Sequence, residues 1–162
     1  MPMSAPKILV VEDEPLLRMA AVDMIEAEGF EAIEAADATE AIAILEARPD
    51  ITIVFTDIDM PRGMDGMKLA ALIRDRWPPI HLIITSGHMT PAQTSLPENS
   101  VFFSKPYRER DVIAQMRRMA AYPPCPQFPQ SMMVLADAWR QRTGLLCPAT
   151  NGHFHLMQLN SH

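Results

Sequence analysis

The sequence lacks the features that mark secreted, membrane-spanning and nucleic-acid-binding proteins. It has only two cysteines, Cys125 and Cys147, far apart in 162 residues, so no disulfide framework is expected and a reducing, cytoplasmic location fits best. No apolar run approaches the roughly 20 residues of a membrane helix, and the N-terminus, MPMSAPKILVV, lacks the pattern of a signal peptide. The net charge is -6 and no long run of Lys or Arg occurs, so we expect no direct nucleic-acid partner and no membrane contact.

Five short runs of β-forming residues alternate with longer segments that have helical periodicity. The runs at 7–11, 51–55 and 81–85 are almost wholly apolar, which is typical of strands buried on both faces of a parallel sheet. The run at 30–35 alternates apolar and acidic residues, as an edge strand does, and a fifth run covers 101–104. The pattern predicts an α/β domain with a doubly wound, five-stranded parallel sheet, and the strand order 2-1-3-4-5 satisfies it.

Helices are expected between these strands. The first is expected at 15–28, because Pro15 suits its first position and Gly29 lies just past its end. Its apolar residues recur at helical spacing, namely Leu16, Leu17, Ala20, Ala21, Met24 and Ile25. Three more are expected at 38–47, 66–76 and 107–121. The segment 90–100 has room for one or two turns at most, because Pro97 interrupts it.

The composition changes after residue 121. The stretch YPPCPQFPQ holds four prolines, which is typical of a stiff, extended linker. Residues 131–144 have the pattern of one short amphipathic helix, and the end of the chain gives no clear signal. We therefore expect a domain at 5–121 and a Pro-rich linker with a short tail of unknown role at 122–162.

Charged and hydroxyl side chains stand where the predicted strands end. Glu12 and Asp13 follow the first strand, Asp57 ends the third, Thr85 ends the fourth and Lys105 follows the fifth. The carboxyl ends of parallel strands share one edge of the sheet, where ligands bind in such folds. We therefore expect three acids, a hydroxyl and an ammonium group around one point.

This combination of groups indicates phosphoryl chemistry. Three neighbouring carboxylates repel one another, and a hard divalent cation such as Mg²⁺, which prefers oxygen ligands, relieves the repulsion. A carboxylate is also a competent nucleophile toward a phosphoryl group. Lys105 and Mg²⁺ would neutralise charge and Thr85 would donate a hydrogen bond to a phosphoryl oxygen. Asp57, at the end of a buried strand, is the candidate for phosphorylation.

Four fragments, in this order and strand context, resemble the receiver domain of two-component response regulators. They are LVVEDEP, TDIDMPRGMDG, IITSGH and FFSKPY, and the resemblance covers residues 5–121. It implies a flavodoxin-like fold with Asp57 as the phosphoacceptor. It also implies that Asp13 and Asp57 bind Mg²⁺ directly, together with the main-chain carbonyl of Asp59, and that Glu12 acts through water.

The resemblance implies further roles at the fourth and fifth strands. Thr85 and Lys105 would contact the phosphoryl group, and the Lys105–Pro106 peptide bond would be cis. Phe102 occupies the aromatic position that moves with Thr85 when such a domain is activated; plain packing of Phe102 in the core is the other interpretation. The phosphoryl donor would be a sensor histidine kinase or a phosphotransfer protein.

The sequence departs from the family pattern in two places. After Met-Pro, Arg62 and Gly63 fill a gap that usually holds one residue, so the loop after Asp57 is longer by one. The short helical segment at 90–100 is the second departure, and it leaves the usual partner-docking face smaller or more mobile.

The expected function is that of a single-domain response regulator that signals to a protein partner by a phosphorylation-biased change of shape. It would not be an enzyme beyond its own phosphorylation and dephosphorylation. A receiver-like adaptor that binds proteins without phosphorylation is the main alternative. DNA binding through the tail is disfavoured because Arg140 and Arg142 are too few for that footprint, and no separate substrate pocket supports a phosphatase acting on other molecules.

Overall fold

The structure, a computed structural model, describes residues 5–61, 64–89, 96–97 and 100–121. The predicted linker and short helix beyond residue 121 therefore lie outside the described residues. So do the inserted loop residues, Arg62 and Gly63, and most of the predicted short helical segment before the fifth strand.

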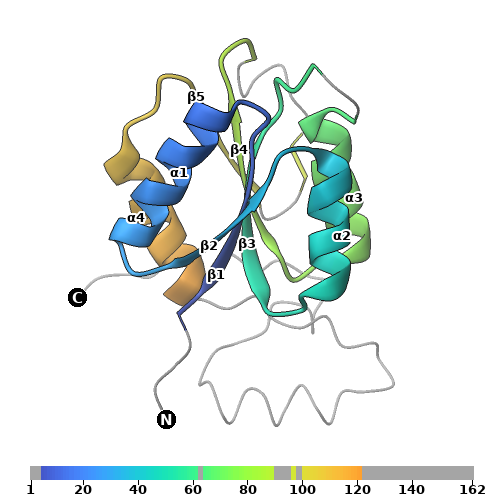
Figure 1. The fold of residues 1–162 in the computed structure, drawn as a ribbon, viewed down its shortest axis with the longest axis horizontal. Helices are drawn as coiled ribbons and strands as arrows, with labels where there is room; N and C mark the ends of the chain where they lie inside the picture. Colours follow the sequence, from blue (N-terminus) through green and yellow to red (C-terminus); the bar gives the residue numbers. More distant parts are fainter. Residues whose placement is uncertain (1–4, 62–63, 90–95, 98–99, 122–162) are drawn as a thin grey trace, which may run out of the picture. The chain divides into compact units, whose positions relative to one another are not determined.

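Five parallel strands form one sheet in the order β2-β1-β3-β4-β5, which confirms the predicted order (Figure 1). The strands are β1 (Lys7–Val11), β2 (Glu31–Ala35), β3 (Ile51–Asp57), β4 (His81–Ser86) and β5 (Ser100–Ser104). The alternating strand β2 lies at an edge, and the continuous apolar strands β1, β3 and β4 lie inside, as their composition predicts. The order of connection reverses between β1 and β3, which places the usual ligand crevice there.

The helices are α1 (Pro15–Ala27), α2 (Ala38–Ala47), α3 (Gly66–Arg76) and α4 (Glu109–Ala121). The second and third have the predicted bounds. The first ends one residue earlier than predicted, and Gly29 follows with a φ of 85°, a conformation that glycine adopts without strain. The last begins two residues later than predicted, because the amides of Asp111 and Val112 bond the carbonyl of Arg108, which sets the first turn there.

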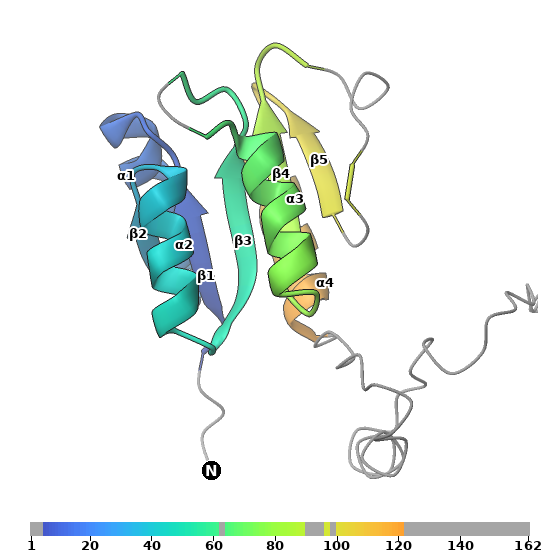
Figure 2. The ribbon, with the colours of Figure 1, turned by 90° about the vertical axis from the view of Figure 1, so that its right-hand side faces the viewer.

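The helices cover both faces of the sheet in two layers. Figure 1 shows α1 and α4 on one face, with α2 and α3 on the other, and in Figure 2 the face that α2 and α3 cover is turned toward the viewer. Alternate residues of the inner strands point to opposite faces of the sheet, and a separate hydrophobic core lies on each face. Ile8, Ile53 and Ile83 pack toward α1 and α4. Leu9 and Val54 pack toward α2 and α3.

Two helices begin at the carboxyl edge of the sheet with aspartate caps. Asp37 accepts from the amide of Glu40 at 2.8 Å, and Glu40 reaches back to the amide of Ala36 at 2.7 Å, a reciprocal cap for α2. Asp65 accepts from the amide of Lys68 at 2.8 Å and caps α3. Such caps contribute about 1 kcal/mol each, so they hold both helix ends beside the edge where the polar residues gather. Among the described residues, no helix combines the length and apolarity needed to cross a membrane.

Candidate functional site at the carboxyl edge of the sheet

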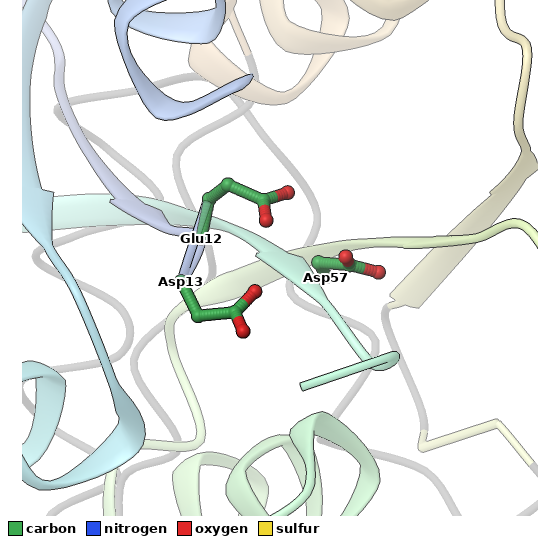
Figure 3. A group of neighbouring side chains, drawn as sticks. All are labelled: Glu12, Asp13 and Asp57. Atoms are coloured by element: carbon green, nitrogen blue, oxygen red, sulfur yellow. The ribbon is translucent and has the colours of Figure 1, made fainter. Parts of the chain in front are cut away.

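Three carboxylates converge where β1 and β3 end. Oxygen atoms of Glu12, Asp13 and Asp57 all lie within 4.8 Å of one another, and Figure 3 shows the side chains of Glu12 and Asp13 extending toward Asp57. Glu12 and Asp57 are buried and Asp13 is half-buried. The structure therefore brings together the acids that the sequence places at the ends of the two strands.

Lys105 supplies the positive charge of this cluster. Its Nζ lies 2.8 Å from Oδ2 of Asp57 and 3.4 Å from Oε2 of Glu12. The main-chain amide of Lys105 donates to the carbonyl of Ser86 at 2.7 Å, which fixes the start of the loop after β5. The Lys105–Pro106 peptide bond is cis, as predicted.

Burial and charge act against each other on the ionisable groups. The pKa of Glu12 is raised because the carboxyl group is buried and faces the charge of Asp57. For Lys105, burial lowers the pKa, but the hydrogen bond and charge of Asp57, together with Glu12, outweigh it and raise the pKa. The lysine thus stays an ammonium ion at neutral pH, while the acids retain a repulsion that one lysine does not remove.

The donor set fits a hard cation. The three converging side chains offer only carboxylate oxygens, which are the ligands that Mg²⁺ prefers, whereas zinc sites usually add nitrogen or sulfur ligands. A divalent cation among them would also relieve the repulsion that raises the pKa of Glu12.

Thr85 lies next to Asp57 on the neighbouring strand. In the parallel register of β3 and β4, Asp57 is the partner of Thr85. The carbonyl of Thr85 accepts from the amide of Ile58 at 3.0 Å, and its buried hydroxyl lies 3.5 Å from the carbonyl of Thr56. The hydroxyl therefore has a long, weak hydrogen bond and can be drawn to a better acceptor.

Phe102 packs in the core on the α2 and α3 side of the sheet. It is half-buried and lies opposite Ile84 in the register of β4 and β5. Its predicted exchange of position with Thr85 stays a prediction.

The side chain of Asp59 faces the end of β4. Its Oδ2 accepts from Ser86 Oγ at 2.9 Å and from the amide of Gly87 at 2.7 Å, and it lies 3.3 Å from Nδ1 of the exposed His88. Burial opposes the charge of Asp59, yet the hydrogen bonds from Gly87, Ser86 and His88 lower its pKa. The carboxylate is thus engaged away from the three acids, which is compatible with the predicted metal contact through the main-chain carbonyl.

Two site residues were missed in the sequence analysis. Arg18 on α1 donates from Nη1 to the carbonyl of Glu12 at 2.8 Å and pairs with Glu34 of β2 at 3.1 Å, so it fastens the loop that carries the acids. Ser86, fully buried, bonds the Asp59 carboxylate. No periodicity reveals the partner of Arg18, because that partner is a main-chain carbonyl. The short polar run Thr85-Ser86-Gly87 at a strand end was the one available hint for Ser86.

Gly66 brings the start of α3 against the main chain of Asp57. A Cβ atom at this position would lie 2.3 Å from the carbonyl oxygen of Asp57 and 2.6 Å from Cα of Ile58. Only glycine permits this approach, so the residue acts on the site through the backbone that carries Asp57.

The site opens to the surface on two sides. A cleft of about 770 Å³ borders Asp13 and runs between the loops that follow β1, β2 and β3. A smaller cleft of about 440 Å³ is lined by Glu12, Lys105 and Pro106, with Leu17 of α1 and Tyr107 at its sides. Asp57 itself is buried, and the two clefts border its neighbours in the cluster, Asp13 on one side and Glu12 and Lys105 on the other.

A protein-family model described as the response regulator receiver domain matches residues 8–117. The chain belongs to this family. The match runs from β1 into α4 and includes every predicted site residue. Receiver domains exchange phosphoryl groups with histidine kinases or phosphotransfer proteins, so membership supports the resemblance read from the four fragments.

Curated relatives share the receiver part of their sequences with this chain. It is 34% identical over 119 residues to the response regulator protein FleR of Pseudomonas aeruginosa, a match that covers 72% of this chain and 25% of FleR. It is 33% identical over 116 residues to the sensor kinase CckA of Brucella abortus, covering 69% of this chain and 12% of that protein. The chain thus spans a quarter or less of the length of these relatives.

Solved receiver structures have the same fold. A response regulator receiver protein from Sinorhizobium medicae matches with a TM-score of 0.65 and 26% identity, over 71% of this chain and 94% of that one. The receiver domain of the hybrid histidine kinase CckA matches with a TM-score of 0.58 and 30% identity, over 70% of this chain and 97% of that domain. These likenesses confirm the predicted flavodoxin-like fold of the receiver.

Proposed function

We propose that this receiver accepts a phosphoryl group on Asp57 and signals by a change of shape. The observation that carries the proposal is the placement of Asp57, whose carboxylate is buried beside two further acids and contacts Lys105 at 2.8 Å. A buried acid cluster is costly to keep for structure alone. It is well suited to bind a cation and to act as a nucleophile.

The chemistry follows from the chain's own groups. An oxygen of Asp57 attacks the phosphorus of a phosphohistidine; the P–N bond breaks, the imidazole leaves with the electron pair, and an acyl phosphate forms. Lys105, an ammonium ion beside Asp57, would move its contact to a phosphoryl oxygen and offset the added charge. Thr85 would donate its hydroxyl proton to another phosphoryl oxygen, in place of its long contact to the carbonyl of Thr56.

The proposed cofactor is Mg²⁺. Asp13, Asp57 and the main-chain carbonyl of Asp59 would hold it directly, and Glu12 through water. When bound, Mg²⁺ would neutralise the acids and the oxygens of the phosphoryl group.

The proposed donor is a sensor histidine kinase or a phosphotransfer protein. Beside the site, α1 begins with apolar side chains that solvent reaches: Leu16 is 73% exposed, Leu17 45% and Met19 58%. Apolar side chains gathered at the mouth of a site favour a protein partner over a small donor alone. Leu17 lines the smaller cleft together with Lys105, whose ammonium group contacts Asp57.

The proposed output is a shift between two arrangements of the receiver, reported by Thr85 and Phe102 and read by a downstream protein partner. We propose that the receiver works in the cytoplasm, without direct nucleic-acid or membrane binding. Its catalysis would be limited to its own phosphorylation and dephosphorylation.

Intact-protein mass spectrometry after incubation with a small phosphodonor tests the proposal. We expect a single phosphoryl adduct that requires Mg²⁺ and is absent from Asp57→Asn. Folding of the variant is checked by circular dichroism. If the folded wild type forms no adduct with Mg²⁺, nor with a histidine-phosphorylated protein donor, the phosphorylation-independent adaptor replaces the proposed function.

A further inference from the structure

The carboxylate of Asp59 is held by residues that follow β4. Ser86 Oγ, the amide of Gly87 and the ring of His88 all approach one oxygen, Oδ2, at 2.9, 2.7 and 3.3 Å. We call this set of four residues the Asp59 clamp. It joins the loop after β3, the strand that ends at Asp57, to the end of β4, the strand that contains Thr85.

Ser86 connects the clamp to the rest of the site. Its hydroxyl donates to Asp59 and accepts from the amides of His88 and Met89 at 3.1 and 3.0 Å, so its lone pairs and its proton are all engaged. Its carbonyl accepts from the amide of Lys105 at 2.7 Å. One buried residue thus joins the loops that follow β3, β4 and β5.

The main chain of Asp59 contacts the proposed phosphoacceptor, Asp57. Its amide donates to Oδ1 of Asp57 at 3.1 Å. One residue earlier, the amide of Ile58 bonds the carbonyl of Thr85 at 3.0 Å. A force on the Asp59 side chain is therefore transmitted to the orientation of the Asp57 carboxylate and of the Asp59 carbonyl.

We propose that the Asp59 side chain is a positioning residue that sets the cation affinity of the site through the main chain of residues 57–59. The inference rests on the proposed function, because it concerns the cation that the acids would hold. The clamp orients Asp57 and the Asp59 carbonyl, and it links their occupation to the loop after β4. Because such coupling is reciprocal, binding of the cation should change the environment of the Gly87 and Met89 amides.

A merely structural role would make a different prediction. If the clamp only fastened two loops, its removal would lower stability and leave the cation affinity of the folded protein unchanged. If the carboxylate charge of Asp59 acted on the cation directly, neutralising that charge would weaken binding even with the clamp hydrogen bonds retained.

The affinity of the full chain for Mn²⁺, measured by electron paramagnetic resonance, distinguishes a positioning role from a structural role and from a direct effect of the charge. Asp59→Ala removes the clamp, and Ser86→Ala removes one arm without adding bulk. Asp59→Asn keeps a carbonyl oxygen that can accept from Ser86 and Gly87. The matched control is Asp75→Ala, which removes an exposed carboxylate of α3.

We expect Asp59→Ala to bind Mn²⁺ roughly tenfold more weakly, the usual scale for residues that orient metal ligands. Ser86→Ala should weaken binding by a smaller factor, whereas Asp59→Asn and the control should stay within about twofold of the wild type. Equal affinity of Asp59→Ala and the wild type would overturn the proposal. An equally large loss in Asp59→Asn would also overturn it, because charge and not position would then be the cause.

Nuclear magnetic resonance supplies a readout that stability alone does not move. Addition of Mg²⁺ should shift the amide signals of Gly87 and Met89 in the wild type and in Asp59→Asn, and leave them unchanged in a folded Asp59→Ala. The same shifts in Asp59→Ala would show that the clamp carries no coupling. A wild type that binds neither cation would instead refute the proposed function, and the inference would fall with it.

Discussion

Lys105 shows how a single residue is tuned by opposing effects. Burial favours the neutral amine, while the hydrogen bond from its ammonium to Asp57 favours the charged form and prevails. Because the folded-state pKa is raised, the interaction stabilises the fold fully below the pKa of a lysine in the unfolded chain. That stabilisation is lost as pH rises through the higher folded-state pKa.

Replacing Asp57 should therefore lower the pKa of Lys105. In Asp57→Asn the charge of Asp57 is lost and only a neutral, weaker acceptor oxygen remains for the ammonium, while burial still opposes its charge. We expect the titration midpoint of the Lys105 Cε signal, followed by carbon-detected nuclear magnetic resonance without metal, to fall from the wild-type value. When both proteins are unfolded in urea, the Lys105 signal should have the same titration midpoint in the wild type and in Asp57→Asn. An unchanged midpoint in the folded variant would mean that the 2.8 Å contact to Asp57 does not form in solution.

Arg18 acts at the same scale on a different loop. It donates to the main-chain carbonyl of Glu12, the first residue after β1, and its second contact is Glu34 on the neighbouring strand β2. A guanidinium group can make both contacts at once because it offers several donors in a fixed plane. A lysine would make one of them.

At the scale of elements, the critical contact is that of α3 with the end of β3. The helix starts at Gly66, directly after the Asp65 cap, and its backbone lies against the carbonyl of Asp57. Asp57 is thus held between its own strand and the first turn of α3, so a shift of this helix end should be transmitted to Asp57.

Gly66→Ala should disturb this contact. A Cβ atom 2.3 Å from the Asp57 oxygen requires a shift of α3 or of residues 57 and 58. We expect a loss of about 1–3 kcal/mol in the free energy of unfolding, the scale of overpacked cores, measured by urea denaturation. Mass spectrometry should also show slower adduct formation in the folded fraction.

Gly87→Ala is the control for this prediction. Its added Cβ would meet Asp59 and Lys105 at 3.9 Å, an ordinary contact, and the amide that donates to Asp59 remains. We expect near-wild-type stability. Comparable losses in both glycine variants would indicate that general backbone entropy, and not the approach of α3 to Asp57, explains the effect.

At the scale of the whole molecule, the receiver concentrates charge, access and apolar surface at one end. The three acids, both clefts and the exposed start of α1 all lie at the carboxyl edge of the sheet. We therefore expect a protein that delivers a phosphoryl group to Asp57 to contact α1, and its affinity should depend on that surface.

Leu17→Asp should separate protein donors from small donors. The new charge would oppose burial of α1 under a partner, so transfer from a phosphorylated histidine kinase or phosphotransfer protein should slow by roughly tenfold or more, the scale of 1–3 kcal/mol at a central contact. Labelling by a small phosphodonor should change little. The rate of transfer from the protein donor is measured by quenching the reaction at set times and analysing it by gel autoradiography. The rate of labelling by the small phosphodonor is measured by mass spectrometry.

The matched control is Ala43→Asp, which adds the same charge at an exposed position of α2. It should leave both rates near the wild-type values. If Leu17→Asp slowed the small donor as much as the protein donor, the effect would lie in the site and not in docking.

Much of this architecture could be predicted from the sequence, because its signals are local. Continuous apolar runs mark the inner strands, and the alternating run marks the edge strand β2. Proline and glycine bracket α1. The acids, Thr85 and Lys105 stand at strand ends, so the topology of a parallel sheet was sufficient to place them at one edge.

The apolar spacing of α1 predicts only part of which side chains are buried. Ala21, Met24 and Ile25 are buried as their spacing predicts, whereas Leu16 and Leu17 are exposed. Periodicity reports the face of a helix but not where the sheet beneath it ends. The first turn of α1 projects past that end, and its leucines therefore meet solvent and not the core.

The sequence by itself determined the elements, their order and the identity of the groups at the carboxyl edge, because each depends on neighbours along the chain. Only the tertiary structure decided that Arg18 holds the acid loop, that Gly66 lies against Asp57, and that the Asp59 carboxylate turns to β4. These contacts join residues of different elements through main-chain atoms or a single side chain. Their partners are set by how the loops meet at the edge of the sheet, and no spacing within one segment encodes that meeting.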